Sequence, residues 1–289
     1  MANLQLHLQF SGCRPLHLPV EIWAHIIQYL DSGRDLAVLA RTCHLIQSEA
    51  ERALYRELDV TLGSTFAEHL RTMPLRLTDH VHILHIMLGC FDNEMEHSRC
   101  DDQIRCGLMR LRNLKILDGF HPIYMTTDHG SRYPFHLVKF TTGSPILDNI
   151  RSFFNSQSSI EILEWSPFGA DLRTANTFDD DVLPNLRSFQ SSVPTTAPLL
   201  IVTSAQRRVV RLAIESGSIN RVLSLPTFHY PPLRVLKVGG LISVVTHRLG
   251  SMFPNLSYLE FRVNTFKVSR RQAVSVSYTD LESSHPLLR

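Results

Sequence analysis

Three closely spaced histidines, His80, His82 and His85, form the group in this sequence that comes nearest to a set of metal ligands. Imidazole nitrogens bind zinc when several ligands converge on one point. If this stretch is a strand, His80 and His82 share one face, and His85 points to the other because side chains alternate along a strand. The three rings would then not converge. We therefore expect surface histidines here and no metal site.

The motifs of the common enzyme classes are absent from the chain. It has no G-x-S-x-G, no G-x-x-x-x-G-K-[ST], no G-x-G-x-x-G and no H-E-x-x-H. Asp179, Asp180 and Asp181 are adjacent and lack the spaced oxygen ligands and the glycine of a calcium loop. We therefore expect a protein that is not an enzyme and that uses no cofactor.

Composition bounds the class of protein and of partner. The chain has 289 residues, of which 44% are hydrophobic and 19% charged, which is typical of a globular protein with room for a small domain and a larger one. Its net charge is only +2, and pairs such as Arg207-Arg208 and Arg270-Arg271 are isolated. A basic track for phosphates is missing, so we expect neither a nucleic-acid partner nor a membrane partner.

The same composition predicts a cytoplasmic or nuclear location. Residues 1–13 lack the basic start and the small-residue cleavage site of a secretory signal, and no apolar run reaches the length of about eighteen residues that a membrane helix needs. The five cysteines are odd in number and form no C-x-x-C pair, which favours reduced thiols over a disulfide framework.

Residues 18–58 have the pattern of a short helical unit. Pro19 suits the first turn of a helix, because its missing N–H would be unpaired there, so we expect a helix from Pro19. One side of that helix carries Ile22, Ile26, Tyr29 and Leu30, and a second side carries Val20, Trp23 and Ile27. So small a unit cannot cover both sides by itself, and a leftover apolar patch indicates a protein interface.

Two further helices complete the predicted unit. Asp31 or Ser32 can cap the second, which carries an apolar stripe. A third stretch follows directly and is rich in good helix formers between Glu49 and Ala53. The stripe of the second helix consists of Leu36, Leu39, Ala40 and Cys43, and the apolar residues of the third stretch are Leu45, Ile46, Ala50, Ala53, Leu54 and Leu58.

These helices resemble the F-box family, in the form of a fungal-type F-box. The resemblance covers about forty residues and is carried by several separately spaced positions. The matching pattern is Leu18-Pro19-x-Glu21-Ile22-x3-Ile26-x2-Tyr29-Leu30, then Asp35-Leu36-x2-Leu39-Ala40-x-Thr42-Cys43, then Glu49-Ala50-x3-Leu54-Tyr55.

The resemblance implies a Skp-type adaptor as partner, and through it the cullin scaffold of an SCF-type ubiquitin ligase. The chain would then be a substrate receptor. The residues that the resemblance assigns to adaptor binding are Leu18, Pro19, Ile22, Ile26, Tyr29, Leu30, Leu36, Leu39 and Cys43.

After about residue 75, short units of the form apolar-x-x-Leu-x-apolar recur, as in Val81-x-x-Leu84-x-Ile86 and Leu233-x-x-Leu236-x-Val238. Their fourth positions at Leu163, Phe189, Leu212, Leu236 and Leu259 are separated by 26, 23, 24 and 23 residues. Such lengths are typical of leucine-rich repeats, which stack one short strand per repeat. The earlier intervals, Leu84 to Leu117 and Leu117 to Leu163, are 33 and 46 residues, which indicates irregular repeats or insertions.

Alternate residues of such strands line an open, concave face that can bind a protein substrate. An unrelated α/β domain with buried strands remains a second interpretation of the same pattern. The alternation Val274, Val276, Tyr278 further predicts one closing strand near the end of the chain. The residues expected on the substrate-binding face are His85, Glu164, Val235, Lys237, Tyr258, Glu260 and Arg262.

The sequence therefore predicts an α/β protein with a small three-helix F-box and a leucine-rich-repeat-like solenoid of short parallel strands. The predicted divisions are an extension over residues 1–14, the F-box over 15–60 and the repeat region over 75–289. The expected function is a substrate receptor for an unknown protein target. The alternative is a leucine-rich-repeat interaction scaffold that is not linked to ubiquitination.

Overall fold

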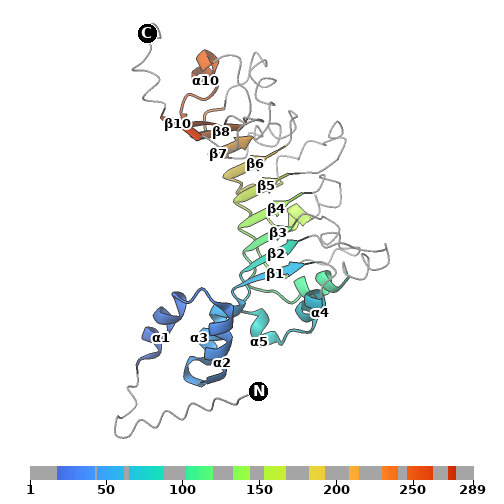
Figure 1. Cartoon of the computed structure of the whole chain (residues 1–289). Coiled ribbons are helices and arrows are strands. Elements are labelled where there is room, and N and C mark those ends of the chain that lie inside the picture. The colour runs from blue at the N-terminus through green and yellow to red at the C-terminus, as the bar shows by residue number, and fades with distance from the viewer. Residues whose placement is uncertain are drawn as a thin grey trace, which may run out of the picture. The chain divides into compact units, whose positions relative to one another are not determined.

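The computed structural model places its helices and strands in two compact units, Met1–Arg56 and Glu57–Arg289, which are described one at a time (Figure 1). The residues that the structure describes are 18–42, 44–61, 65–87, 102–119, 133–143, 153–166, 182–192, 208–214, 230–239, 246–262 and 273–277.

The first unit contains three helices, α1 (Val20–Gln28), α2 (Gly33–Thr42) and α3 (His44–Tyr55). Helix α1 begins one residue later than predicted, because Pro19 is its N-cap and the Pro19 carbonyl accepts the backbone N–H of Ile22 at 3.0 Å. Ser32 caps α2, since its Oγ accepts the backbone N–H of Asp35 at 3.3 Å. The cap predicted at Ser32 is confirmed.

Helices α1 and α2 both pack against α3 and bury a small core. The core is formed by Ile27, Leu36, Ile46 and Ala50, and the side chains packed around it are Trp23, Leu30, Leu39, Ala40, Ala53 and Leu54. The prediction that Leu58 continues the third helix is wrong, because α3 ends at Tyr55 and Leu58 lies in a strand. Residues 57–61 alternate between exposed and buried side chains, which is the period of a strand.

The second unit is built on one ten-stranded sheet whose strands follow each other in chain order. Every neighbouring pair from β1 to β9 is parallel, and β10 is antiparallel to β9. The strands are β1 (Glu57–Thr61), β2 (Ile83–Met87), β3 (Ile116–Gly119), β4 (Lys139–Thr142), β5 (Ile162–Trp165), β6 (Ser188–Ser191), β7 (Arg211–Ile214), β8 (Val235–Gly239), β9 (Tyr258–Arg262) and β10 (Ala273–Ser277).

One register holds the parallel strands together. We call each strand with the turn leading into it a rung, and Figure 1 shows the first six strands as successive rungs. Two backbone N–H groups of each rung from β3 to β9 donate to one carbonyl of the previous rung, as Val138 and Lys139 do to Lys115 at 2.8 and 3.1 Å. The register aligns one buried row, Leu58, Leu84, Leu117, Phe140, Leu163, Phe189, Leu212, Leu236 and Leu259.

Two rungs were missed in the sequence. Strand β1 begins at Glu57, so the sheet starts before the predicted boundary at about residue 75. Strand β4 lies between Leu117 and Leu163, and Phe140 divides their interval of 46 residues into two of 23. The irregular repeat or insertion predicted between these two leucines is therefore wrong, because β4 forms a further rung in that stretch.

Helices α4 (Thr65–Thr72), α5 (Leu75–Thr78) and α10 (Thr246–Met252) lie in the connections. Residues 102–108 are also helical, and a Cβ on Gly107 would meet Leu70 Cγ at 2.6 Å, so only glycine allows this close approach to α4. Polar groups also link the rungs: Gln157 is buried, accepts the Leu137 N–H at 3.0 Å and donates to the Phe135 carbonyl at 3.1 Å.

Candidate functional site

The surface of the helical unit carries a row of exposed apolar side chains on α1 and just before it. Ile22, Ile26 and Tyr29 lie at spacings of four and three on one side of the helix, and Tyr29 is 81% exposed. Leu18 and Val20 at the start of α1 are exposed as well. Trp23 and Ile27, on a second side of α1, and Leu30 just after it pack in the unit's own core, so the prediction that Leu30 shares the side of Ile22, Ile26 and Tyr29 is wrong. We call the five exposed residues the α1 patch.

The structure divides the residues predicted for adaptor binding into two groups. Leu18, Pro19, Ile22, Ile26 and Tyr29 are exposed. Leu36 is in the core at 6% exposure, while Leu30 and Leu39 pack partly buried against that core. Cys43 lies outside the described residues.

One exposed apolar residue on α2 was not among the predicted residues. Val38 is 54% exposed, and Leu36, two positions earlier, is buried. Residues two positions apart lie on different sides of a helix, so the burial of Leu36 and the exposure of Val38 follow from the same orientation of α2. Helical spacing from Leu36 and Leu39 could have assigned Val38 to the outer side.

In the second unit, the sheet brings four of the predicted substrate-binding residues onto one row. His85, Glu164, Lys237 and Glu260 occupy the same register position on β2, β5, β8 and β9. Val235 and Tyr258 face each other two positions earlier, and Arg262 pairs with Gly239 two positions later. We call the face that carries this row and its neighbours two residues away the open face, because the residues between them are buried.

Ion pairs already occupy much of the middle and the end of the open face. Lys139 Nζ lies 2.7 Å from Glu164 Oε1, and Thr141 Oγ1 donates to Glu164 Oε2 at 3.3 Å. Lys237 Nζ lies 2.8 Å from Glu260 Oε2. The Glu260 side chain is only 8% exposed, so this predicted surface residue is largely covered by its neighbours.

Carboxylates gather at the β1–β3 end of the open face. His85 Nε2 lies 3.1 Å from Glu57 Oε1, and His85 Nδ1 lies 3.3 Å from Asp118 Oδ2. Asp59 is the register neighbour of His85 and is exposed. His80 lies in the turn before β2 and His82 just before the strand, so the two do not share a strand face as expected. Within the described part of the chain, no group of three or more His, Cys, Asp or Glu side chains could hold a metal ion.

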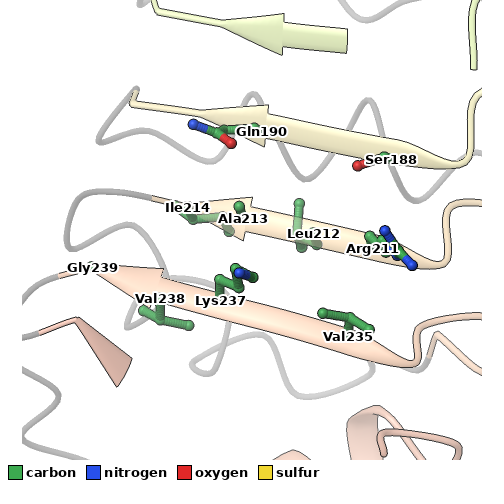
Figure 2. Close-up of a pocket in the computed structure, with 10 residues that line it drawn as sticks. All are labelled: Ser188, Gln190, Arg211, Leu212, Ala213, Ile214, Val235, Lys237, Val238 and Gly239. Atoms are coloured by element: carbon green, nitrogen blue, oxygen red, sulfur yellow. The ribbon is translucent and has the colours of Figure 1, made fainter. Parts of the chain in front are cut away.

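Strands β6, β7 and β8 form a hollow of about 190 Å³, which Figure 2 shows with its lining residues. Ala213 lies between Gln190 and Lys237 in the register, so a small side chain separates two long ones. Arg211 lies on the same face of β7, between Ser188 and Val235. Sequence reasoning missed Arg211 and Ala213, although alternation around Leu212 could have placed both on the open face.

The comparisons with known proteins identify the helical unit. The F-box-like family model matches residues 15–61, so the chain contains an F-box-like domain over that range. This match confirms the family resemblance of the helical segment. None of the curated proteins matches the chain. F-box domains are adaptor-binding modules and not catalytic ones, so the domain indicates a role in protein–protein interaction. Among the described residues, no helix combines the length and the apolar character needed to cross a bilayer.

Proposed function

We propose that this chain is a substrate receptor of an SCF-type ubiquitin ligase, which binds a Skp-type adaptor through its F-box-like domain. The observation that carries the proposal is the α1 patch on a domain that the F-box-like model matches. Five apolar side chains in and before one short helix stay exposed although the unit has its own core. A docked adaptor surface would remove the exposed part of each side chain from water, which contributes roughly 25 cal/mol for each Å² of apolar area buried.

Among the predicted residues, the proposal assigns adaptor contact to the exposed Leu18, Pro19, Ile22, Ile26 and Tyr29, and it adds Val20, the remaining residue of the α1 patch. Leu30, Leu36 and Leu39 then support the helices from within, and they contribute to binding by holding α1 and α2 in place. The cullin scaffold would be reached only through the adaptor.

We further propose that the sheet unit is a leucine-rich-repeat-like solenoid whose open face binds the protein target. The regular spacing of the buried row, the common register of β1 to β9 and the alternation of exposed and buried residues support this interpretation. The mixed charges of the open face suit a protein partner better than a nucleic acid, which would need a continuous basic track. A repeat scaffold without a link to ubiquitination would leave the α1 patch without a role.

The proposal is tested by purifying the full chain with a Skp-type adaptor. Ile26→Glu should abolish recovery of the adaptor, because an unpaired carboxylate in an apolar interface costs several kcal/mol. Leu75→Glu is the matched control, since Leu75, like Ile26, is an exposed branched aliphatic residue but lies in the sheet unit. Circular dichroism and thermal melting must show that both variants fold. Full adaptor recovery by a folded Ile26→Glu protein would overturn the proposed adaptor site.

A further inference from the structure

We propose that the hollow between β6, β7 and β8 binds an aspartate or glutamate side chain of the target protein, with Arg211 as its main partner. The inference rests on the proposed function of the open face and adds the chemistry of the residue that anchors the target there. The candidate is distinct from the ion pairs described above, because Arg211 lines the hollow and belongs to neither of them.

Arg211 is exposed, and no ion pair joins it to another residue in the described part of the chain. The other cation at the hollow, Lys237, is neutralised by Glu260 at 2.8 Å. The lining therefore carries one uncompensated positive charge. A guanidinium presents its N–H donors in a planar fork that matches a carboxylate with two parallel hydrogen bonds, so its preferred partner is a carboxylate.

The shape of the hollow places a ligand beside that charge. Ala213 lies on the same strand face as Arg211, two residues further on, and its small side chain leaves space between Gln190 and Lys237 (Figure 2). The Ser188 hydroxyl adds a polar group that can donate a hydrogen bond to a carboxylate. A volume of about 190 Å³ suits one side chain of a protein segment lying across the open face.

The rest of the open face favours a protein segment with a single acidic side chain over a phosphate backbone. Glu164 and Glu260 lie on rungs on either side of the hollow, and Glu57, Asp59 and Asp118 lie at the far end of the same face. A nucleic-acid strand would meet these carboxylates along its path. A single acidic side chain held at Arg211 meets only the cationic part of the surface.

The test selects binders from a display library of random twelve-residue peptides on the full-length protein. The best peptides are synthesised with a fluorescent label, and their affinities are measured by anisotropy. We expect an Asp or Glu in the selected peptides, and replacing it with Asn or Gln should weaken binding at least about tenfold, as for loss of a charge-assisted hydrogen-bond pair. Arg211→Gln should weaken binding equally, and Ala213→Leu should do so by filling the hollow without changing the charge.

Arg208→Gln is the matched control, because Arg208 is exposed, precedes β7 and does not line the hollow. It removes the same charge and should leave the affinity unchanged. Selection repeated on Arg211→Glu should enrich Lys or Arg in place of Asp or Glu. Equal weakening by Arg208→Gln would reduce the effect to bulk charge and overturn the site, as would selected peptides without an acidic residue or no selected peptides at all.

Failure of this site is distinguishable from failure of the proposed function. If Ile26→Glu abolishes adaptor recovery and Asp59→Lys changes the protein partners of the chain, the receptor function stands and only the acidic anchor falls. If both variants behave as the unchanged protein does, the proposed function falls as well.

Discussion

The side-chain amide of Asn255 donates a hydrogen bond of 2.9 Å from Nδ2 to the backbone carbonyl oxygen of Pro231, which belongs to the preceding rung. Asn185 makes the same contact to Ser158 at 3.0 Å, and Asn113 makes it to Asp79 at 2.8 Å. Each asparagine lies three residues before its strand and each acceptor four residues before the previous strand. Three rungs thus use the same asparagine hydrogen bond to hold the turn of the preceding rung.

Removing these three hydrogen bonds should cause a measurable loss of stability. Replacing Asn113, Asn185 and Asn255 together with Ala should lower the free energy of unfolding by about 2 kcal/mol, since each exposed hydrogen bond contributes about 0.5–1 kcal/mol and the sites are far apart. The melting temperature should fall by roughly 4–8 °C. Asn155→Ala is the control, because Asn155 is exposed and makes no such contact to another rung. Equal melting temperatures for the triple variant and the control would show that these bonds do not stabilise the sheet.

The division of the predicted adaptor residues into core and surface gives a second prediction. Leu36→Ala should lower the free energy of unfolding of the helical unit by about 2–5 kcal/mol, because it leaves a cavity in a small core. Ile26→Ala should change stability by less than about 1 kcal/mol, since Ile26 is exposed. Chemical denaturation followed by the fluorescence of Trp23, which packs against that core, measures both. Similar losses for the two variants would contradict the assignment of Ile26 to the surface.

The pair formed by Lys237 and Glu260 gives a third prediction. Glu260→Lys should destabilise the sheet unit, because it places a second cation beside Lys237 at a position where the side chain is largely buried. Combining it with Lys237→Glu should recover part of that loss. Because the Lys237 side chain is 39% exposed, water screens the pair, and the coupling in a double-mutant cycle should be about 0.5–1 kcal/mol. A coupling of zero would show that the pair adds nothing to stability.

This pair also shows how much of the site the sequence could predict. Alternation within a strand correctly puts His85, Glu164, Lys237 and Glu260 on one face. Side-chain contacts on this face depend on which residues become neighbours across rungs, and a missed rung hides the contacts with the strands on both sides of it. Lys139, the partner of Glu164, lies on the missed strand β4, so the pair could not be foreseen.

The missed rungs have a physical explanation in their side chains. Strand β4 has Phe140 at the usual leucine position and Thr142 at the second buried position, so it departs from the Leu-x-apolar form of strands such as β2, β5 and β8. Thr142 is nevertheless buried. Strand β1 follows α3 after a single residue and has no proline or glycine signal before it. A helical period continued through Leu58 therefore fitted the sequence as well as a strand did.

Burial of Tyr133 gives a fourth prediction, which concerns alkaline pH. Tyr133 is 5% exposed and stacks on Phe135 with ring centroids 5.1 Å apart. Burial raises the pKa of Tyr133 to about 12, against a slight lowering by Arg105. The unfolded chain then loses this proton near pH 10 while the folded chain keeps it, so stability falls as the pH rises from about 10 to about 12.

Tyr133→Phe removes this titration. Between pH 9 and pH 11, the free energy of unfolding of this variant should fall by about 1 kcal/mol less than that of the unchanged protein. Urea denaturation at the two pH values measures the difference, which is independent of any constant effect of the lost hydroxyl group. Identical pH dependence in the two proteins would show that Tyr133 ionises as readily in the folded chain as in the unfolded one.

The last prediction concerns strand β10, which confirms the closing strand expected near the end of the chain. Ala273–Ser277 pairs antiparallel with β9, and Val274 and Val276 lie opposite Phe261 and Leu259. Tyr278, the third residue of the expected alternation, lies outside the described residues.

Deleting residues from Ser269 onward would leave the outer edge of β9 with unpaired N–H and C=O groups. Such an edge is a template for pairing with another chain. We therefore expect the shortened protein to melt at a lower temperature and to form dimers or larger species in light scattering, while adaptor recovery is unchanged. The matched control deletes residues from Tyr278 onward and keeps β10. It should match the full chain in melting temperature and in light scattering. If both deletions melt at the temperature of the full chain and stay monomeric, β10 does not protect the end of the sheet, and β9 is stable as its last strand.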